Sequence, residues 1–395
     1  MTPALDPDAP LLHRWRGVLA GPLVAAVTMI SALIATSVAG VPLRDPDGVA
    51  GGRFVWALIV VAMLMGLDMV IQAGRRSGQI RPSRAAIRHV QRERWTLQRA
   101  VVVFSALISF YITYLAYRNL KSVVPLMRPG ELFDRQLADI DRSIFGGNDP
   151  AALLHDLLGT GISTEVLSIV YMLFFAFIPL SLALALVFSP NLQGGLFYVT
   201  AQSLNWVLGA ASYFLLPSLG PIYVDPPAFG NLAYTEVGRL QEILLSQRFM
   251  FLNEPAATGG AQSIAAFASL HVSILFTGVL AAHLLGLARG LKLAVWTMFI
   301  LTTIATIHLG WHYVLDDIGG LVIAITAVAV ARALTGFDLA AARGRMTAPS
   351  PSSLRAPRPA TAQPATAQPA TAQPATAQPA TAQSATAQPA SPTPV

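Results

Sequence analysis

Long apolar stretches dominate this chain and leave it few possible folds. A helix needs about 20 mostly apolar residues to cross a bilayer. Of the 395 residues, 54% are hydrophobic and only 12% are charged, whereas a soluble domain carries about 25% charged residues. We therefore predict an all-α integral membrane protein with about eight transmembrane helices. The predicted segments are Gly17–Ala39, Phe54–Ala73, Ala100–Tyr117, Val166–Val187, Leu196–Leu216, Ser269–Leu287, Leu291–Leu309 and Leu315–Ala331.

The distribution of basic residues predicts how these helices are oriented. The connection Gly74–Arg99 holds eight arginines and one glutamate. Short loops rich in Arg and Lys stay on the cytoplasmic side of a membrane. Alternation then places both termini inside and the loops Arg118–Glu165 and Pro217–Ala268 outside. The basic connection is also suited to anionic lipid headgroups, whereas nucleic acid is not an expected partner of so short a loop. We predict a multi-pass protein of the cell membrane.

Three regions differ in composition. Residues 1–99 contain the first two predicted helices and the basic connection, residues 100–335 contain the other six helices, and residues 336–395 form a polar tail. From Pro359 the tail repeats PATAQ five times and then SATAQ. Such a segment cannot bury a core and is predicted to be disordered. The chain has no cysteine, which excludes disulfides, thiolate nucleophiles and cysteine-ligated metals.

The stretch HLGWHYVLDDIGG, His308–Gly320, places two histidines and two aspartates next to apolar segments. His308, His312 and Asp316 are spaced by four, so on a continuous helix they would share one face. Gly310 is the position at which such a helix would break. An Asp one turn from a His accepts its N–H and leaves the other ring nitrogen as a base or nucleophile. A polar cap at a helix end explains this stretch equally well.

Two further polar clusters fall on the same predicted side. Ser269 and His271, in the stretch AAFASLH, stand where a helix begins, and a helix start with a capping serine binds anions. Lys121 and Arg128, in KSVVPLMRP, follow the third predicted helix at its outer end, and such cations hold phosphate. Taken alone, each cluster also fits simple capping or contact with headgroups. Together the three clusters predict metal-free phosphoryl transfer with a histidine nucleophile.

The clusters resemble the three signature motifs of the type 2 phosphatidic acid phosphatase superfamily, which are K-x6-R-P, P-S-G-H and S-R-x5-H-x3-D on a core of six membrane helices. Lys121, Arg128 and Pro129 match the first motif. Ser269 and His271 match the second. The form SLH resembles the second motif of the branch that contains inositol phosphorylceramide synthases. The stretch GWHYVLDDIGG resembles the third motif of that branch, with His312 and Asp316 in the H-x3-D positions. The resemblance implies that the last six helices form the core and that the first two are additions.

The resemblance also implies a role for each motif residue. His312 would be the nucleophile and Asp316 would orient it, while His271 would protonate the leaving group and then activate the acceptor. The residues that would bind the substrate phosphate are Lys121, Arg128 and Ser269. These roles imply an enzyme without metal or cofactor, either a lipid phosphotransferase or a phosphatase. Its substrate would be a phospholipid or a polyprenyl phosphate at the extracytoplasmic leaflet, with a polyol as acceptor in the inositolphosphotransferase case.

Two departures from the motifs matter for the phosphate contacts. Ala268 stands where the family has proline, and Ala305–Thr306 stands where it has Ser-Arg. Another cation is then expected in place of the missing arginine, and Arg135 and Arg142 are candidates. Asp317 is expected to be solvated at the helix start, and His308 to be a polar interface residue.

Two segments of the outer loops are predicted to lie on the membrane as amphipathic helices. In Glu131–Pro150, the carboxylates of Asp134, Asp139 and Asp141 are candidates for binding polyol hydroxyls, and a solvated polar face is the alternative. Tyr234–Phe249 is predicted as a second interfacial helix that covers the site.

Two other functional classes remain open from the sequence. Metal-dependent hydrolysis would use His308, His312 and Asp316 as ligands. A transporter would place its ionisable residues in mid-membrane on broken helices, whereas here they cluster at one surface.

Overall fold

The computed structural model describes residues 11–46, 48, 52, 54–189, 192–257 and 261–338. All of them belong to the first of two units into which the chain divides, residues 1–346 and 347–395. The tail that is predicted to be disordered, residues 336–395, lies outside the described residues except for residues 336–338. The described part is built from helices without a strand: α1 (Leu11–Val38), α2 (Phe54–Ser77), α3 (Arg84–Arg94), α4 (Leu97–Met127), α5 (Asp134–Ile144), α6 (Pro150–Leu158), α7 (Ile162–Val187), α8 (Leu192–Leu215), α9 (Pro221–Val224), the 3-10 helix η2 (Pro226–Phe229), α10 (Glu236–Asn253), α11 (Leu270–Leu284), α12 (Arg289–His308) and α13 (Val314–Thr335).

Each of the eight predicted membrane segments coincides with one helix, which confirms the all-α prediction. Six helices are long and apolar enough to cross a membrane, namely α1, α2, α4, α7, α12 and α13. This makes the chain a multi-pass membrane protein. The other two helices are α11, which is apolar but has only 15 residues, and α8. The number of eight crossings stays a prediction.

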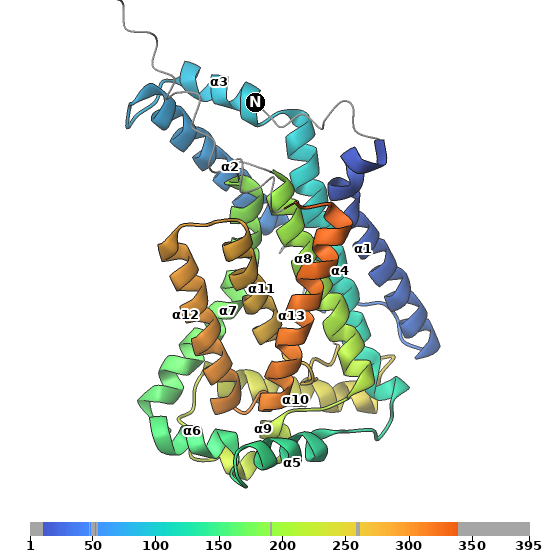
Figure 1. Ribbon diagram of the computed structural model, residues 1–395. Coiled ribbons are helices and arrows are strands. Elements are labelled where there is room, and N and C mark those ends of the chain that lie inside the picture. The colour runs from blue at the N-terminus through green and yellow to red at the C-terminus, as the bar shows by residue number, and fades with distance from the viewer. Residues whose placement is uncertain are drawn as a thin grey trace, which may run out of the picture. The chain divides into compact units, whose positions relative to one another are not determined.

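Polar side chains explain why α8 is less apolar than its neighbours. The helix packs against α4, α11 and α13 in the interior of the bundle (Figure 1). Asn205 Nδ2 donates to Gln202 Oε1 and to Thr277 Oγ1 of α11, both at 3.0 Å. The Ser273 hydroxyl of α11 donates to Asn205 Oδ1 at 3.1 Å. Since apolar burial drives little association between helices in lipid, such bonds help to hold α8 and α11 together.

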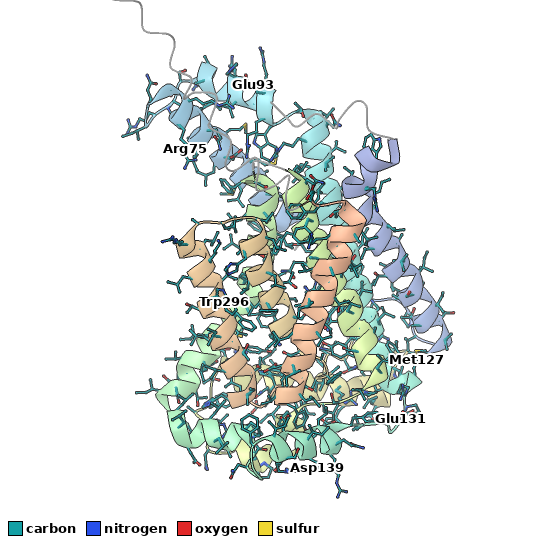
Figure 2. The ribbon with its side chains drawn as sticks, in the orientation of Figure 1. Arg75, Glu93, Met127, Glu131, Asp139 and Trp296 are labelled. Atoms are coloured by element: carbon teal, nitrogen blue, oxygen red, sulfur yellow. The ribbon has the colours of Figure 1, made fainter. Side chains whose placement is uncertain are left out.

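The two ends of the bundle differ in charge and in construction. At one end the basic helix α3 follows α2, and Arg94 Nε lies 2.6 Å from the buried carboxylate of Asp68. At the other end the short helices α5, α6, α9 and α10 lie across the bundle (Figure 1). Figure 2 places Arg75 and Glu93 at the first end and Glu131 and Asp139 at the second. This arrangement agrees with the predicted alternation, and the side of the cell that each end faces stays a prediction.

The polar stretch between α12 and α13 is not one helix. α12 ends at His308, Gly310 has φ +72°, and α13 begins at Val314. The amides of Trp311 and His312 both donate to the carbonyl of Thr306, which folds the chain back instead of extending the helix. The helix breaks at Gly310, the position that the sequence indicated, so His308, His312 and Asp316 do not share one helix face.

Replacing Gly310 with alanine is expected to lower the free energy of unfolding. The positive φ costs about 1–3 kcal/mol for a residue with a side chain, and the new Cβ would lie 2.7 Å from a ring carbon of Phe229. Gly146→Ala is the matched control, because Gly146 also has a positive φ but no heavy atom within 4 Å of a built Cβ. Thermal unfolding in detergent should give Gly310→Ala the lower Tm of the two variants, and equal values would contradict the role of the contact.

Candidate active site

Two histidine rings meet at the end of the bundle covered by the short helices. His271 Nδ1 lies 3.2 Å from His312 Nε2. On the other side of the His312 ring, Nδ1 lies 3.3 Å from Asp316 Oδ2, which also accepts the Tyr313 N–H at 2.9 Å. When Asp316 accepts the Nδ1–H, the lone pair of His312 is on Nε2 and faces His271. The structure thus brings together the three residues predicted to carry the reaction.

Lys121 supplies positive charge next to these rings. α4 continues to Met127, past the predicted end at Tyr117, so Lys121 belongs to the helix and not to the outer loop. Its Nζ lies 4.9 Å from the ring centroid of Tyr213, within the range of a cation–π contact. Burial, and then the charge of Lys121, lower the pKa of His312 to about 3. His312 is therefore neutral at physiological pH, which is the form that a nucleophile requires.

A cavity of about 240 Å³ opens beside the two histidines. Its charged lining residues are Arg118 and Lys121, and none of the described residues that line it is Asp or Glu. Seven lining residues are Tyr or Trp, and among them Tyr171 and Trp311 stack with ring centroids 5.3 Å apart. A cavity with cations, aromatic walls and no carboxylate suits an anionic group attached to a larger organic molecule.

The helix α10 forms part of the cavity wall. It contributes Leu240 and Leu244 to the lining. It spans Glu236–Asn253, close to the predicted interfacial helix Tyr234–Phe249. The predicted helix is therefore present and contributes to the wall of the cavity, and its position at the membrane interface stays a prediction.

Ser269 is the N-cap of α11, as predicted, and its Oγ accepts the Val272 N–H at 3.4 Å. The serine is fully buried. Its role in phosphate binding stays a prediction. The expectation that Asp317 is solvated is wrong, because Asp317 is buried, and the Thr306 hydroxyl donates to its Oδ2 at 3.4 Å.

Arg128 is not among the residues that line the cavity. It is the C-cap of α4, and one of its terminal nitrogens donates to the carbonyl of Phe214 at 2.6 Å. The other terminal nitrogen forms an ion pair with Glu131. Arg128 therefore does not line the cavity together with Lys121, its partner in the first motif.

Two of the three aspartates of α5, Asp134 and Asp141, bind backbone donors. Asp134 accepts the amides of Leu219 and Gly220, each at 2.9 Å. Asp141 accepts the amides of Val314 and Leu315 at 2.6 and 3.1 Å. Burial raises the pKa of both carboxyl groups against the opposing effect of these bonds. Neither polyol binding nor a solvated face describes them, because both carboxylates act as caps between segments that are distant in sequence.

His308 points away from the cavity. Its Nε2 lies 3.0 Å from the Thr164 hydroxyl, and its ring centroid lies 4.8 Å from that of His155. Among the described residues, no group of three His, Asp or Glu side chains is placed to hold a metal ion. His308, His312 and Asp316 do not form such a group.

Arg118 is the lining residue that the sequence interpretation missed. It precedes Lys121 by three positions, so both lie on one face of α4, and its Nη1 donates to the Ser263 hydroxyl at 2.6 Å. The cations proposed from the sequence, Arg135 and Arg142, do not line the cavity, and Arg142 pairs with Asp139 at the surface. A second cation one turn from Lys121 in an apolar helix was the signal that could have identified Arg118.

Comparison with known proteins gives one finding that bears on this geometry. Residues 135–330 match the model of the PAP2 superfamily. The PAP2 match includes His271, His312 and Asp316, and it begins after Lys121 and Arg128. No curated protein and no solved structure matches the chain.

Replacing Lys121 with methionine is expected to raise the pKa of His312. A nearby positive charge disfavours the imidazolium form, so its removal makes protonation easier. Burial is the larger cause and persists, so the pKa should stay below the ordinary value of 6.5. An NMR titration of ¹⁵N-labelled histidine in micelles measures it. Lys292→Met, at the start of α12, is the control. An unchanged pKa of His312 in Lys121→Met would contradict the effect of the Lys121 charge on that histidine.

Replacing Asp141 with alanine is expected to destabilise the protein by about 0.5–2 kcal/mol, the range for a lost helix cap. The amides of Val314 and Leu315, next to His312, would lose their acceptor. Asp139→Ala serves as the control because its carboxylate is exposed and pairs with Arg142. If thermal unfolding gave both variants the same Tm, the capping role of Asp141 would be refuted.

Proposed function

We propose that this protein is a membrane enzyme that transfers the phosphoryl group of a lipid phosphoester through a phosphohistidine at His312. The observation that carries the proposal is the alignment of Asp316, His312 and His271, with His312 Nε2 3.2 Å from His271 Nδ1. The PAP2 match over residues 135–330 supports the same reaction class.

The first chemical step uses both rings. The Nε2 lone pair of His312 attacks phosphorus while the bond between phosphorus and the lipid oxygen breaks. Asp316 stabilises the positive charge that develops on the His312 ring. His271, whose protonated form is favoured once the phosphate's negative charge is bound, donates its proton to the leaving oxygen. Lys121 stabilises the charge on the phosphoryl oxygens.

The second step releases the phosphoryl group. His271 removes a proton from the acceptor, the acceptor oxygen attacks phosphorus, and the bond between phosphorus and His312 breaks. Water as acceptor makes the enzyme a phosphatase, and an alcohol makes it a transferase. We favour a polyol acceptor in an inositolphosphotransferase-like reaction, because the aromatic walls of the cavity offer flat surfaces to a ring-shaped polyol.

The substrate class follows from the location of the cavity. It lies at one end of a bundle of membrane helices, where a phosphate at the bilayer surface meets the histidines while its apolar chain remains in the bilayer. We propose a phospholipid or polyprenyl phosphate as substrate. The opposite, arginine-rich end favours an extracytoplasmic site under the rule that basic loops stay inside.

Purified protein in vesicles that contain ³²P-labelled phosphatidic acid or polyprenyl phosphate tests the proposal. Acid-labile label is expected on the wild-type chain and none on His312→Ala, while His283→Ala, at the far end of α11, should label normally. Asp316→Asn should slow turnover by about 10²–10⁴-fold, as expected for a lost imidazole orienter. Absence of an adduct during wild-type turnover would refute the phosphohistidine.

A polyol added to the same assay distinguishes the two reactions. A transferase gives a phosphorylated polyol at the expense of free phosphate. If phosphate is released equally with and without inositol and no phosphorylated inositol forms, the enzyme is a phosphatase. Chelators are expected to leave either activity unchanged.

A further inference from the structure

One face of α4 carries a row of side chains into the cavity. Tyr114, Tyr117, Arg118 and Lys121 all line it, and their spacing of three and four residues places them on one helical stripe. Arg118 and Lys121 are the two charged residues of this stripe. The stripe gives the cavity two cations that belong to one rigid element.

The positions where the family motifs would supply arginines do not serve the cavity. Thr306 occupies the third-motif arginine position, and its hydroxyl lies 3.4 Å from Asp317. Arg128, the first-motif arginine, is directed to Glu131 and to the carbonyl of Phe214. A phosphate held by Lys121 alone would keep several of its oxygens without a charged partner.

We propose that Arg118 is the second phosphate-binding cation of the site and replaces the arginine that is absent at Thr306. The assignment rests on the proposed function for the identity of the natural ligand, but the ligand chemistry is that of a phosphate oxyanion in either case. Arg118 binds one side of the phosphate and Lys121 the side nearer the histidines. Ser263, which accepts from Arg118 Nη1 at 2.6 Å, orients the guanidinium toward the cavity.

The residue type fits this role better than a structural one. A guanidinium presents a planar set of donors that matches two phosphate oxygens at once. No described residue lining the cavity is acidic, whereas Arg118 and Lys121 both line it, so the charge of the lining favours an anionic ligand.

Phosphate binding tests the proposal without turnover. The His312→Ala protein is titrated with inorganic phosphate by calorimetry in detergent micelles. The titration is then repeated with the double variant that carries His312→Ala and Arg118→Ala. The dissociation constant is expected to rise about tenfold or more, as for a lost hydrogen-bonded charge. Arg239→Ala, an exposed arginine of α10 that pairs with Glu236, is the matched control and should bind phosphate like the background protein.

Two further variants protect the test against misfolding. Arg118→Lys keeps the charge but loses the planar donor set, so a smaller loss than that of Arg118→Ala is expected. Arg128→Ala should weaken binding less than Arg118→Ala does. Unchanged binding in folded Arg118→Ala and Arg118→Lys, or a tenfold loss found in Arg128→Ala instead, would overturn the proposal.

Lipid turnover provides the second, separate readout. In the His312-containing enzyme, Arg118→Ala should raise KM for the lipid phosphate by a similar factor. If the wild-type protein turns over no lipid phosphate, the proposed function fails while the phosphate titration still decides the role of Arg118. If turnover is normal and Arg118→Ala changes neither KM nor phosphate binding, only the assignment of Arg118 fails.

Discussion

The first amides of α13 need acceptors, and the way they obtain them fixes the end of the bundle where the two histidines meet. A helix leaves its first N–H groups without partners of its own. Asp316 accepts the amide of Tyr313, and Asp141 of α5 accepts those of Val314 and Leu315. His312 directly precedes these residues, so the same bonds that complete the helix start hold its ring between Asp316 and His271.

The second carboxylate of α5 connects this helix start to a different loop. Asp134 binds the amides of Leu219 and Gly220, and the Tyr313 hydroxyl lies 3.3 Å from its Oδ1. One short helix at the end of the bundle therefore positions both the segment after α8 and the segment before α13. The histidine pair depends on a helix that contributes no residue to the lining of the cavity.

The fold could be predicted from the sequence more completely than the site. Apolar stretches of membrane-spanning length located α1, α2, α4, α7, α8, α11, α12 and α13, and the spacing of His312 and Asp316 predicted their contact. The end of α4 was placed too early, because Arg118 and Lys121 interrupt the apolar run at Tyr117 although the helix continues to Met127. Arg128 was predicted from its place in the first motif, whereas Arg118 belongs to none of the three motifs. The roles of Asp134 and Asp141 were not predictable, because their partners lie far away in the sequence and are backbone groups, which carry no residue-specific signal.

The aromatic lining of the cavity has an experimental consequence of its own. Two of the chain's six tryptophans, Trp206 and Trp311, line it, and the indole nitrogen of each is buried without a hydrogen-bond partner among the described residues. The emission of an indole responds to the polarity and the charges around it. The native chain therefore contains its own optical reporters of cavity occupancy, and ligand entry can be followed by fluorescence without a label.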